Sequence, residues 1–174
     1  MRFFNQRRHF ADLSEREILA LAISSEEDDA RIYRTYADRL RDEFPDTARL
    51  FEGMAEEEDR HRRRLIALHE KRFGETIPLI RREHVAGFYA RRPVWLVENL
   101  GIERIRTEAE LMEQEAERFY HTAAQRSSDA ETRSLLGDLA AAEAAHREVA
   151  DTLAEAHLDD DARSAEDHTA RRRF

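Results

Sequence analysis

The strongest constraint on this chain is a Glu-x-x-His motif that occurs twice, as Glu-Asp-Arg-His at positions 58–61 and as Glu-Ala-Ala-His at positions 143–146. On an α-helix, residues i and i+3 lie on one face, so the carboxylate and the imidazole of each motif point in the same direction. Both groups are ligands for divalent metal ions. The two motifs therefore predict two helices that offer metal ligands to a common centre.

Signals of helix start and end predict four long helices around these motifs. Capping boxes at Ser14-x-x-Glu17 and Ser128-x-x-Glu131 each precede a periodic apolar run, and Pro93 is suited to the first position of a helix. The predicted helices span residues 14–43, 46–72, 93–126 and 128–157. Short connections predict two antiparallel hairpins, and the long link between them is expected to pack along the bundle with a short helix of its own.

Each predicted helix carries an apolar stripe at 3–4 spacing, which is interrupted near its middle by carboxylates and, on two helices, by a histidine. The polar residues on these stripes are Glu26, Glu58, His61, Glu113, Glu143 and His146. Four charged glutamates facing a core would each cost several kcal/mol. Two divalent cations would cancel their charge, and oxygen and nitrogen donors favour iron, manganese or zinc over Cu(I).

The chain also repeats itself. Glu113 lies 87 positions after Glu26, and Glu143 lies 85 positions after Glu58. In both halves the single glutamate is followed seven residues later by a tyrosine and then by the Glu-x-x-His motif, as if one helical hairpin had been duplicated. These tyrosines are expected either to hydrogen-bond the ligand carboxylates or only to fill the core. They are Tyr33 and Tyr120.

The composition excludes several other classes of protein. Cysteine is absent, which rules out disulfides, cysteine-ligated zinc, iron–sulfur clusters and thiol nucleophiles. Five glycines and three prolines are too few for the turns of an all-β fold, and a net charge of −9 argues against nucleic acid as a partner. Because neither a membrane span nor a signal peptide is recognisable, we expect a soluble, cytoplasmic protein.

This arrangement of single glutamates and Glu-x-x-His motifs resembles that of the ferritin-like and rubrerythrin-like di-iron carboxylate proteins. Two local sequences are similar to rubrerythrin relatives, Ala-Glu-Glu-Glu-Asp-Arg-His at 55–61 and Leu-Met-Glu-Gln-Glu-Ala-Glu-Arg-Phe-Tyr at 111–120. The resemblance implies an all-α fold over residues 1–157, a ferritin-like four-helix bundle of two antiparallel hairpins joined by a long crossover. Residues 158–174 would then be a polar tail or linker.

The resemblance also implies a centre that holds two iron ions, with manganese and zinc as open alternatives. Glu58 and Glu143 would bridge the metals, and each remaining glutamate would complete one position together with a histidine. An extra carboxylate ligand, present in some rubrerythrins, would come from Glu110. The predicted ligands are therefore Glu26, Glu58 and His61 from one half, and Glu110, Glu113, Glu143 and His146 from the other.

For the activity, the resemblance implies oxidation of Fe(II) by O₂ or H₂O₂ in iron detoxification, storage or export. An alternative is a non-catalytic domain that captures iron and delivers it to a transporter. A third alternative, a metal-free structural bundle, is disfavoured by the polar residues in the core.

A narrower similarity links the chain to the N-terminal domain of bacterial membrane-bound ferritins. It rests on Arg-Arg-Pro-Val-Trp-Leu at 91–96 and on the basic C-terminal end at 171–173. In those proteins a cytosolic ferritin-like domain precedes a vacuolar-iron-transporter-like membrane domain, so residues 158–174 would lead to such a domain at the cytosolic face of the inner membrane. The chain departs from the peroxide-reducing rubrerythrins because it has no cysteines for a rubredoxin module, and Asp29 stands where many relatives have a small residue.

We further expect a homodimer or a larger assembly, because the link over 73–92 contains apolar residues that a single bundle leaves partly uncovered. A link of this length would also permit helices to exchange between subunits. Counted from Pro45, Glu26 lies 19 residues away and Glu58 lies 13, a mismatch of about 9 Å that an uneven turn and the spread from Glu58 to His61 are expected to absorb. Histidines outside the two motifs are predicted to lie on the surface: His9, His69, His84, His121, His157 and His168.

Overall fold

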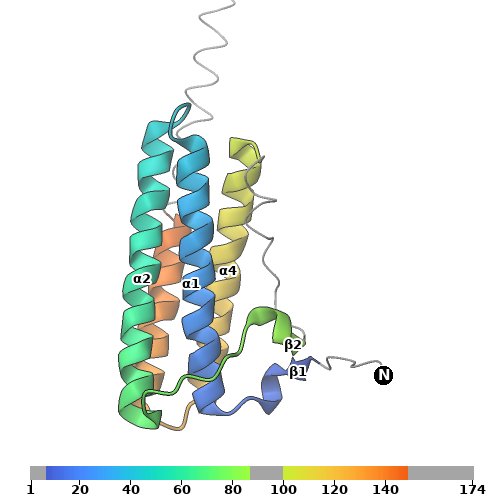
Figure 1. Ribbon diagram of the computed structural model, residues 1–174, viewed down its shortest axis with the longest axis vertical. Coiled ribbons are helices and arrows are strands. Elements are labelled where there is room, and N and C mark those ends of the chain that lie inside the picture. The colour runs from blue at the N-terminus through green and yellow to red at the C-terminus, as the bar shows by residue number, and fades with distance from the viewer. Residues whose placement is uncertain (1–6, 87–99, 149–174) are drawn as a thin grey trace, which may run out of the picture.

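The computed structural model describes residues 7–86 and 100–148. Four long helices form a bundle in these ranges (Figure 1): α1 (Glu15–Leu40), α2 (Pro45–Phe73), α4 (Ile102–Arg126) and a helical segment over 130–148, coloured orange. Helix α1 is antiparallel to α2, and α4 is antiparallel to the helical segment 130–148. The structure confirms the predicted all-α bundle of two helical hairpins.

The first hairpin has well-defined ends. Ser14 caps α1 through the predicted capping box, since its backbone N–H donates to the Glu17 carboxylate at 2.9 Å and its hydroxyl accepts from the Glu17 N–H at 3.3 Å. Helix α1 ends at Leu40, three residues earlier than predicted, and α2 starts with Pro45 at its first turn. Helix α2 ends before Gly74, whose positive φ of 84° suits glycine.

Two predicted boundaries in the second hairpin are wrong. A continuous helix from Pro93 to Arg126 is interrupted, because Gly101 is extended (φ −73°, ψ 162°) and α4 starts after it; Pro93 itself lies outside the described residues. Glycine is a poor helix former, which explains a boundary at this position. The helical segment 130–148 is capped by Asp129 rather than Ser128, since the Asp129 carboxylate accepts from the Thr132 N–H at 2.9 Å.

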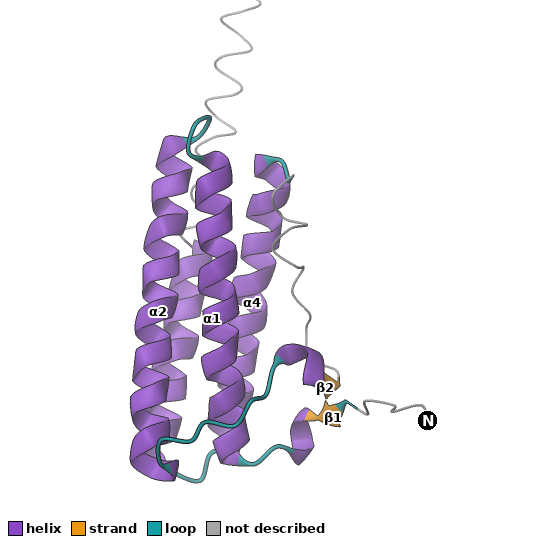
Figure 2. Ribbon diagram, viewed as in Figure 1, coloured by secondary structure: helices purple, strands orange, loops and turns teal. Residues whose placement is uncertain are grey.

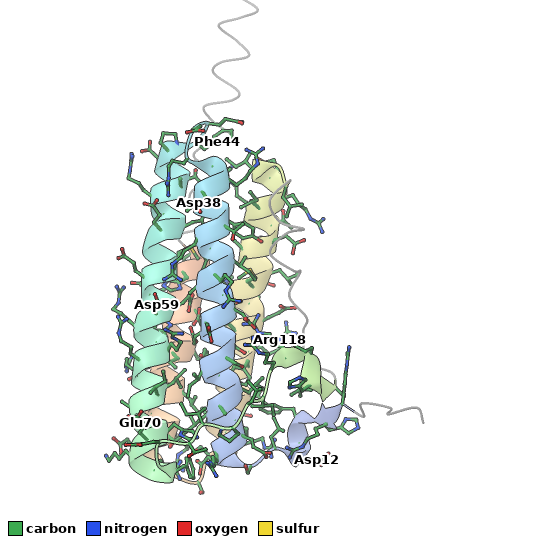
Figure 3. All side chains as sticks on the ribbon, in the orientation of Figure 1. Asp12, Asp38, Phe44, Asp59, Glu70 and Arg118 are labelled. Atoms are coloured by element: carbon green, nitrogen blue, oxygen red, sulfur yellow. The ribbon has the colours of Figure 1, made fainter. Side chains whose placement is uncertain are left out.

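The core consists of two apolar clusters at different levels of the bundle. One contains Leu19 and Leu65, and the other contains Tyr33 and Phe51. The buried carboxylates and histidines of the predicted stripes lie between these clusters, whereas charged residues such as Asp38 and Glu70 lie on the outside (Figure 3). The bundle therefore has a polar layer enclosed by apolar packing on both sides.

His69 is buried, so its predicted surface position is wrong. The side chain is 0% exposed and its ring lies 5.5 Å from that of Phe73 near the end of α2. Burial lowers the pKa of His69, and the nearby charge of Arg16 lowers it further. The neutral ring behaves as part of the core at this end of the bundle.

The described part of the crossover, residues 74–86, runs across α1 (Figure 2). It contains a 3-10 turn at Arg82–His84 and the short strand β2 (Val85–Ala86), which pairs in parallel with β1 (Arg8–His9); a second 3-10 turn, Phe10–Asp12, follows β1. The crossover buries Ile80 and Val85 against the bundle, whereas Leu79 is 83% exposed. The predicted packing along the bundle is correct for this part, whose only helical turn is the 3-10 turn at Arg82–His84; the rest of the link, where a short helix is also expected, lies outside the described residues.

Arg82 attaches the crossover to α1. The residue is 3% exposed, and its guanidinium donates to the two carboxylate oxygens of Asp29 at 2.9 and 2.7 Å. It also donates to the hydroxyl of Ser25 at 3.1 Å and to the Ser25 carbonyl at 2.6 Å. A bidentate arginine–carboxylate pair fixes both position and orientation, so the crossover is held one turn from Glu26.

Within the described ranges, the structure contains no helix that combines the length and the hydropathy needed to cross a membrane. Several predictions fall outside these ranges: the similarity at 91–96, the basic end at 171–173, the end of the last helix at 157 and the tail over 158–174.

Candidate metal centre

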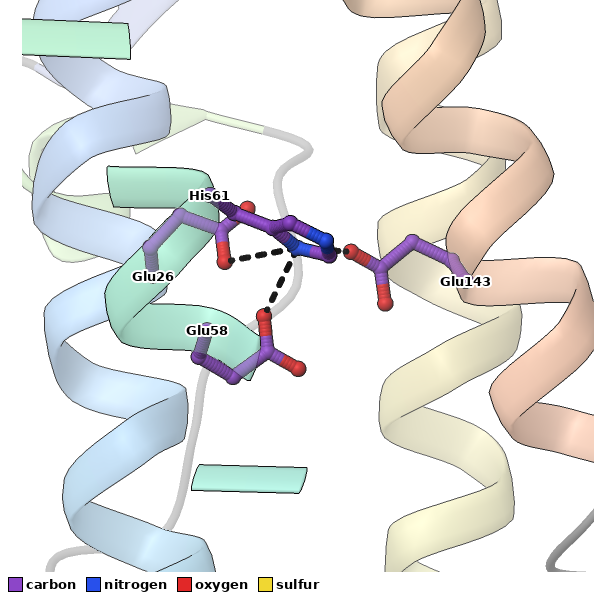
Figure 4. Close-up of side chains that lie close together, drawn as sticks. All are labelled: Glu26, Glu58, His61 and Glu143. Atoms are coloured by element: carbon purple, nitrogen blue, oxygen red, sulfur yellow. Dashed lines mark ion pairs between the residues drawn. The ribbon is translucent and has the colours of Figure 1, made fainter. Parts of the chain in front are cut away.

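Six side chains from the four helices meet in the polar layer of the bundle. All six lie on the predicted stripes, and none of the six residues is more than 9% exposed. Figure 4 shows four of them, with the imidazole of His61 facing three carboxylates. The six residues are Glu26, Glu58, His61, Glu113, Glu143 and His146.

The turn between α1 and α2 absorbs the mismatch between Glu26 and Glu58 that the residue count gives. Helix α1 ends at Leu40, so the turn before Pro45 does not add to its length. Glu26 lies 14 residues before the end of α1, and Glu58 lies 13 residues after the start of α2. A difference of one residue corresponds to about 1.5 Å along a helix, and the two carboxylates are therefore level.

Two overlapping groups of ligand atoms can be distinguished within the six residues. One group combines Glu26 and His61 with the pair Glu58 and Glu143, and the other combines Glu113 and His146 with the same pair. In each group the ligand atoms lie within 4.8 Å of one another. Glu58 and Glu143 thus belong to both groups, as the bridging prediction requires.

The shared carboxylates divide their oxygens between the two histidines. Around His61 Nδ1, Glu58 Oε2 and Glu143 Oε1 both lie at 3.4 Å, and Glu26 Oε2 lies at 3.7 Å. Around His146 Nδ1, the other oxygens of Glu58 and Glu143 lie at 3.9 and 3.6 Å, and Glu113 Oε2 lies at 3.5 Å. Each shared carboxylate can therefore give one oxygen to each of two metal positions.

Two tyrosines bind the remaining carboxylate oxygens in a crosswise pattern. The hydroxyl of Tyr33 donates to Glu113 Oε1, and that of Tyr120 donates to Glu26 Oε1. Burial and the charge of Glu113 raise the pKa of Tyr33 well above its usual value, so this residue stays a neutral donor. Each tyrosine thus orients the glutamate of the other half, which leaves that glutamate's second oxygen directed at the centre.

The metal-free centre is electrostatically unfavourable. Burial, together with neighbouring carboxylates, raises the pKa of Glu26, Glu58 and Glu113. Burial alone would lower the pKa of both histidines, but the adjacent carboxylates outweigh it and raise the pKa of His61 to about 12 and that of His146 to about 11. Without metal, protons must therefore supply the positive charge that the carboxylates require.

The chemistry of the donor set fits a pair of cations. Five buried polar atoms at the centre have no hydrogen-bond partner within the described part of the chain: Glu26 Oε2, His61 Nδ1, Glu113 Oε2, Glu143 Oε1 and His146 Nδ1. Such buried atoms are costly unless a bound ion satisfies them. Carboxylate and imidazole donors suit iron, manganese and zinc.

Glu110 lies outside this cluster. It is half-buried and accepts a hydrogen bond from the side chain of Gln114 at 2.9 Å on its own helix. Its carboxylate is not among the ligand atoms that gather at the centre. The structure therefore brings together six of the seven predicted ligands.

Two residues next to the centre were not predicted from the sequence. Glu57 accepts a hydrogen bond from Nε2 of His146, and Arg82 pairs with Asp29 one turn from Glu26. Glu57 could have been found from the repeat, because it directly precedes Glu58 and the matching position in the second half is an alanine. Arg82 had a weaker signal, namely that a carboxylate at Asp29 on the core side of a helix needs a cationic partner.

These features define a metal-binding four-helix bundle of the di-iron carboxylate class. The rubrerythrin family model matches residues 17–154, and the chain belongs to the rubrerythrin family. A solved structure of a hypothetical protein from Pyrococcus furiosus has the same fold, with a TM-score of 0.67 and 24% sequence identity over 86% of this chain and 94% of that chain. No curated protein matches the chain.

Metal binding is expected to stabilise the fold, and more strongly as the pH rises. In the metal-free protein, the raised pKa values of His61 and His146 contribute stability that is complete below their ordinary value of 6.5 and is lost as the pH rises towards 11–12. Metal must displace these protons, so its apparent affinity should rise by roughly tenfold per pH unit for each proton released. A hundredfold excess over Kd contributes about 2.7 kcal/mol per site, or several degrees in Tm.

Anaerobic melting curves with Mn(II) between pH 5 and pH 8 measure this effect. The increase in Tm should be small at pH 5 and largest at pH 8. A Tm that Mn(II) leaves unchanged at neutral pH would contradict a metal role for the buried cluster.

Proposed function

We propose that this protein binds two iron ions in the bundle centre and oxidises Fe(II) with O₂ or H₂O₂. The observation that carries the proposal is the position of Glu58 and Glu143, each of which directs one oxygen towards each histidine. Shared carboxylates hold two metals close together, so that two electrons are available to one oxidant. Manganese or zinc could occupy the same ligands, and zinc, which has no redox chemistry, would not support this reaction.

Two histidines would bind the iron ions, and two tyrosines would orient the carboxylates that bind them. His61 and His146 present Nδ1 to the centre and must be neutral to bind a metal, so iron binding releases their protons. Tyr33 and Tyr120 hold Glu113 and Glu26 with one oxygen free for the metal. When bound, iron supplies the one-electron steps, while the anionic ligands favour the ferric product.

The alternative function is iron capture without turnover, with the metal passed on to a transporter. Both functions use the same ligands, so they differ only in whether oxidation continues beyond the first two irons. The predicted homodimer, the cytoplasmic location and the attachment to a membrane transporter domain stay predictions from the sequence.

A turnover measurement tests the proposal. Anaerobic protein is mixed with increasing Fe(II), O₂ or H₂O₂ is added, and formation of Fe(III) is followed by absorbance. Oxidation of many Fe(II) per chain, faster than in buffer, is the expected result. Glu56→Ala is the matched control for Glu58→Ala in this assay, because Glu56 is exposed on α2 two residues before Glu58. Oxidation that stops at two Fe(II) per chain would favour iron capture, and a chain that binds no Fe(II) would contradict both functions.

A further inference from the structure

The two halves of the centre are equivalent in their ligands but not in the groups around them. Glu58 matches Glu143, and His61 matches His146, with the same spacing inside each motif. One position earlier the match fails, because Glu57 precedes Glu58 whereas Ala142 precedes Glu143. The two metal positions therefore differ in one carboxylate.

Glu57 reaches across the bundle from α2 to the helical segment 130–148. The His146 ring donates from Nε2 to Glu57 Oε2, while its Nδ1 faces the centre at 3.5 Å from Glu113 Oε2. The other oxygen of Glu57 lies 2.8 Å from the guanidinium of Arg60. Glu57 is thus held between a cation and the imidazole, and it fixes the His146 ring with Nδ1 directed inward.

His61 has no equivalent support. Its Nδ1 faces the centre as that of His146 does, and the two rings are nearly parallel, with centroids 6.0 Å apart. By the symmetry of the repeat, a partner for His61 Nε2 would come from position 142, where the half-buried alanine offers only a methyl group. Among residues 7–86 and 100–148, no carboxylate accepts from Nε2 of His61.

A carboxylate behind a metal-bound imidazole fixes its tautomer and orientation and makes the ring a stronger donor, and losing it costs about 10–100-fold in metal affinity. We propose that Glu57 is a positioning residue that makes the two metal positions unequal, so that the His146 position fills first and more tightly than the His61 position. This inference rests on the proposed function, because it requires that the centre holds two metals.

Anaerobic titration with Co(II), whose visible absorption reports each bound ion, tests the inference. The wild-type protein should bind two Co(II) in steps separated by about 10–100-fold in Kd. His61→Ala isolates the His146 position and His146→Ala isolates the His61 position. Adding Glu57→Ala should weaken binding about 10–100-fold in the first background and leave it unchanged in the second.

A gain-of-function variant separates positioning from a general structural effect. Ala142→Glu gives His61 the carboxylate that it lacks, so it should tighten the weaker step of the wild-type protein and bring the two steps together. Combined with Glu57→Ala it should reverse the order of filling. Glu57→Gln keeps an acceptor oxygen without the charge and should restore part of the affinity lost in Glu57→Ala.

The possible results separate the two proposals. A wild-type protein that binds no Co(II) and no Fe(II) contradicts the proposed function. If the protein binds two ions but Glu57→Ala has no effect, or the same effect in both single-histidine backgrounds, the inference is wrong while the proposed function stands.

Discussion

Replacing Glu58 or Glu143 by alanine is expected to abolish the binding of a metal pair. Each of these carboxylates belongs to both groups of ligand atoms, and each has one oxygen near each histidine. A single substitution therefore removes a ligand from both positions at once. We expect the metal content to fall from two ions per chain to less than one.

Substitutions of the two glutamates that belong to only one group of ligand atoms serve as controls for Glu58→Ala and Glu143→Ala. Glu26 belongs to one group and Glu113 to the other, so Glu26→Ala and Glu113→Ala should each leave one ion bound. Stoichiometry is measured by anaerobic titration with Fe(II) followed by elemental analysis of the desalted protein. If Glu58→Ala and Glu143→Ala both retain two irons, neither residue is a bridge.

Much of the centre could be predicted because it follows from helical periodicity. The 3–4 spacing places Glu26 on the core face of α1 and Glu58 with His61 on that of α2, and all three are buried there. The axial register depended on one further detail, the end of α1. Since Leu40 ends that helix earlier than expected, the turn absorbs the residues that would have displaced Glu26.

The contacts between helices could not be predicted from a single sequence. The sequence pattern indicated that Tyr33 and Tyr120 share a face with the ligands, but the crosswise bonds to Glu113 and Glu26 depend on which helices lie opposite each other. The role of Glu57 also depends on this arrangement, because it faces a histidine from the other half of the chain. Periodicity identifies the face of a helix, whereas packing determines the partner on that face.

The largest loss of stability is expected for Arg82→Ala. This side chain and that of Asp29 are both buried, and the substitution removes two charge-assisted hydrogen bonds from the Asp29 carboxylate. Breaking a buried ion pair on one side costs about 3–5 kcal/mol, because the other charge stays in a medium of low polarity. The variant also loses the bonds from Arg82 to Ser25 that hold the crossover on α1.

Arg81→Ala is the matched control for this experiment. Arg81 is the preceding residue and pairs with Asp28 at 3.3 Å, but its side chain is 34% exposed, so its loss should cost less than about 1 kcal/mol. Urea unfolding of the metal-free proteins measures both differences. Replacing Arg82 and Asp29 together by leucine should recover most of the stability lost in Arg82→Ala, since apolar pairs of similar volume substitute well for buried ion pairs. If Arg82→Ala costs no more than Arg81→Ala, the buried pair does not hold the crossover to the bundle.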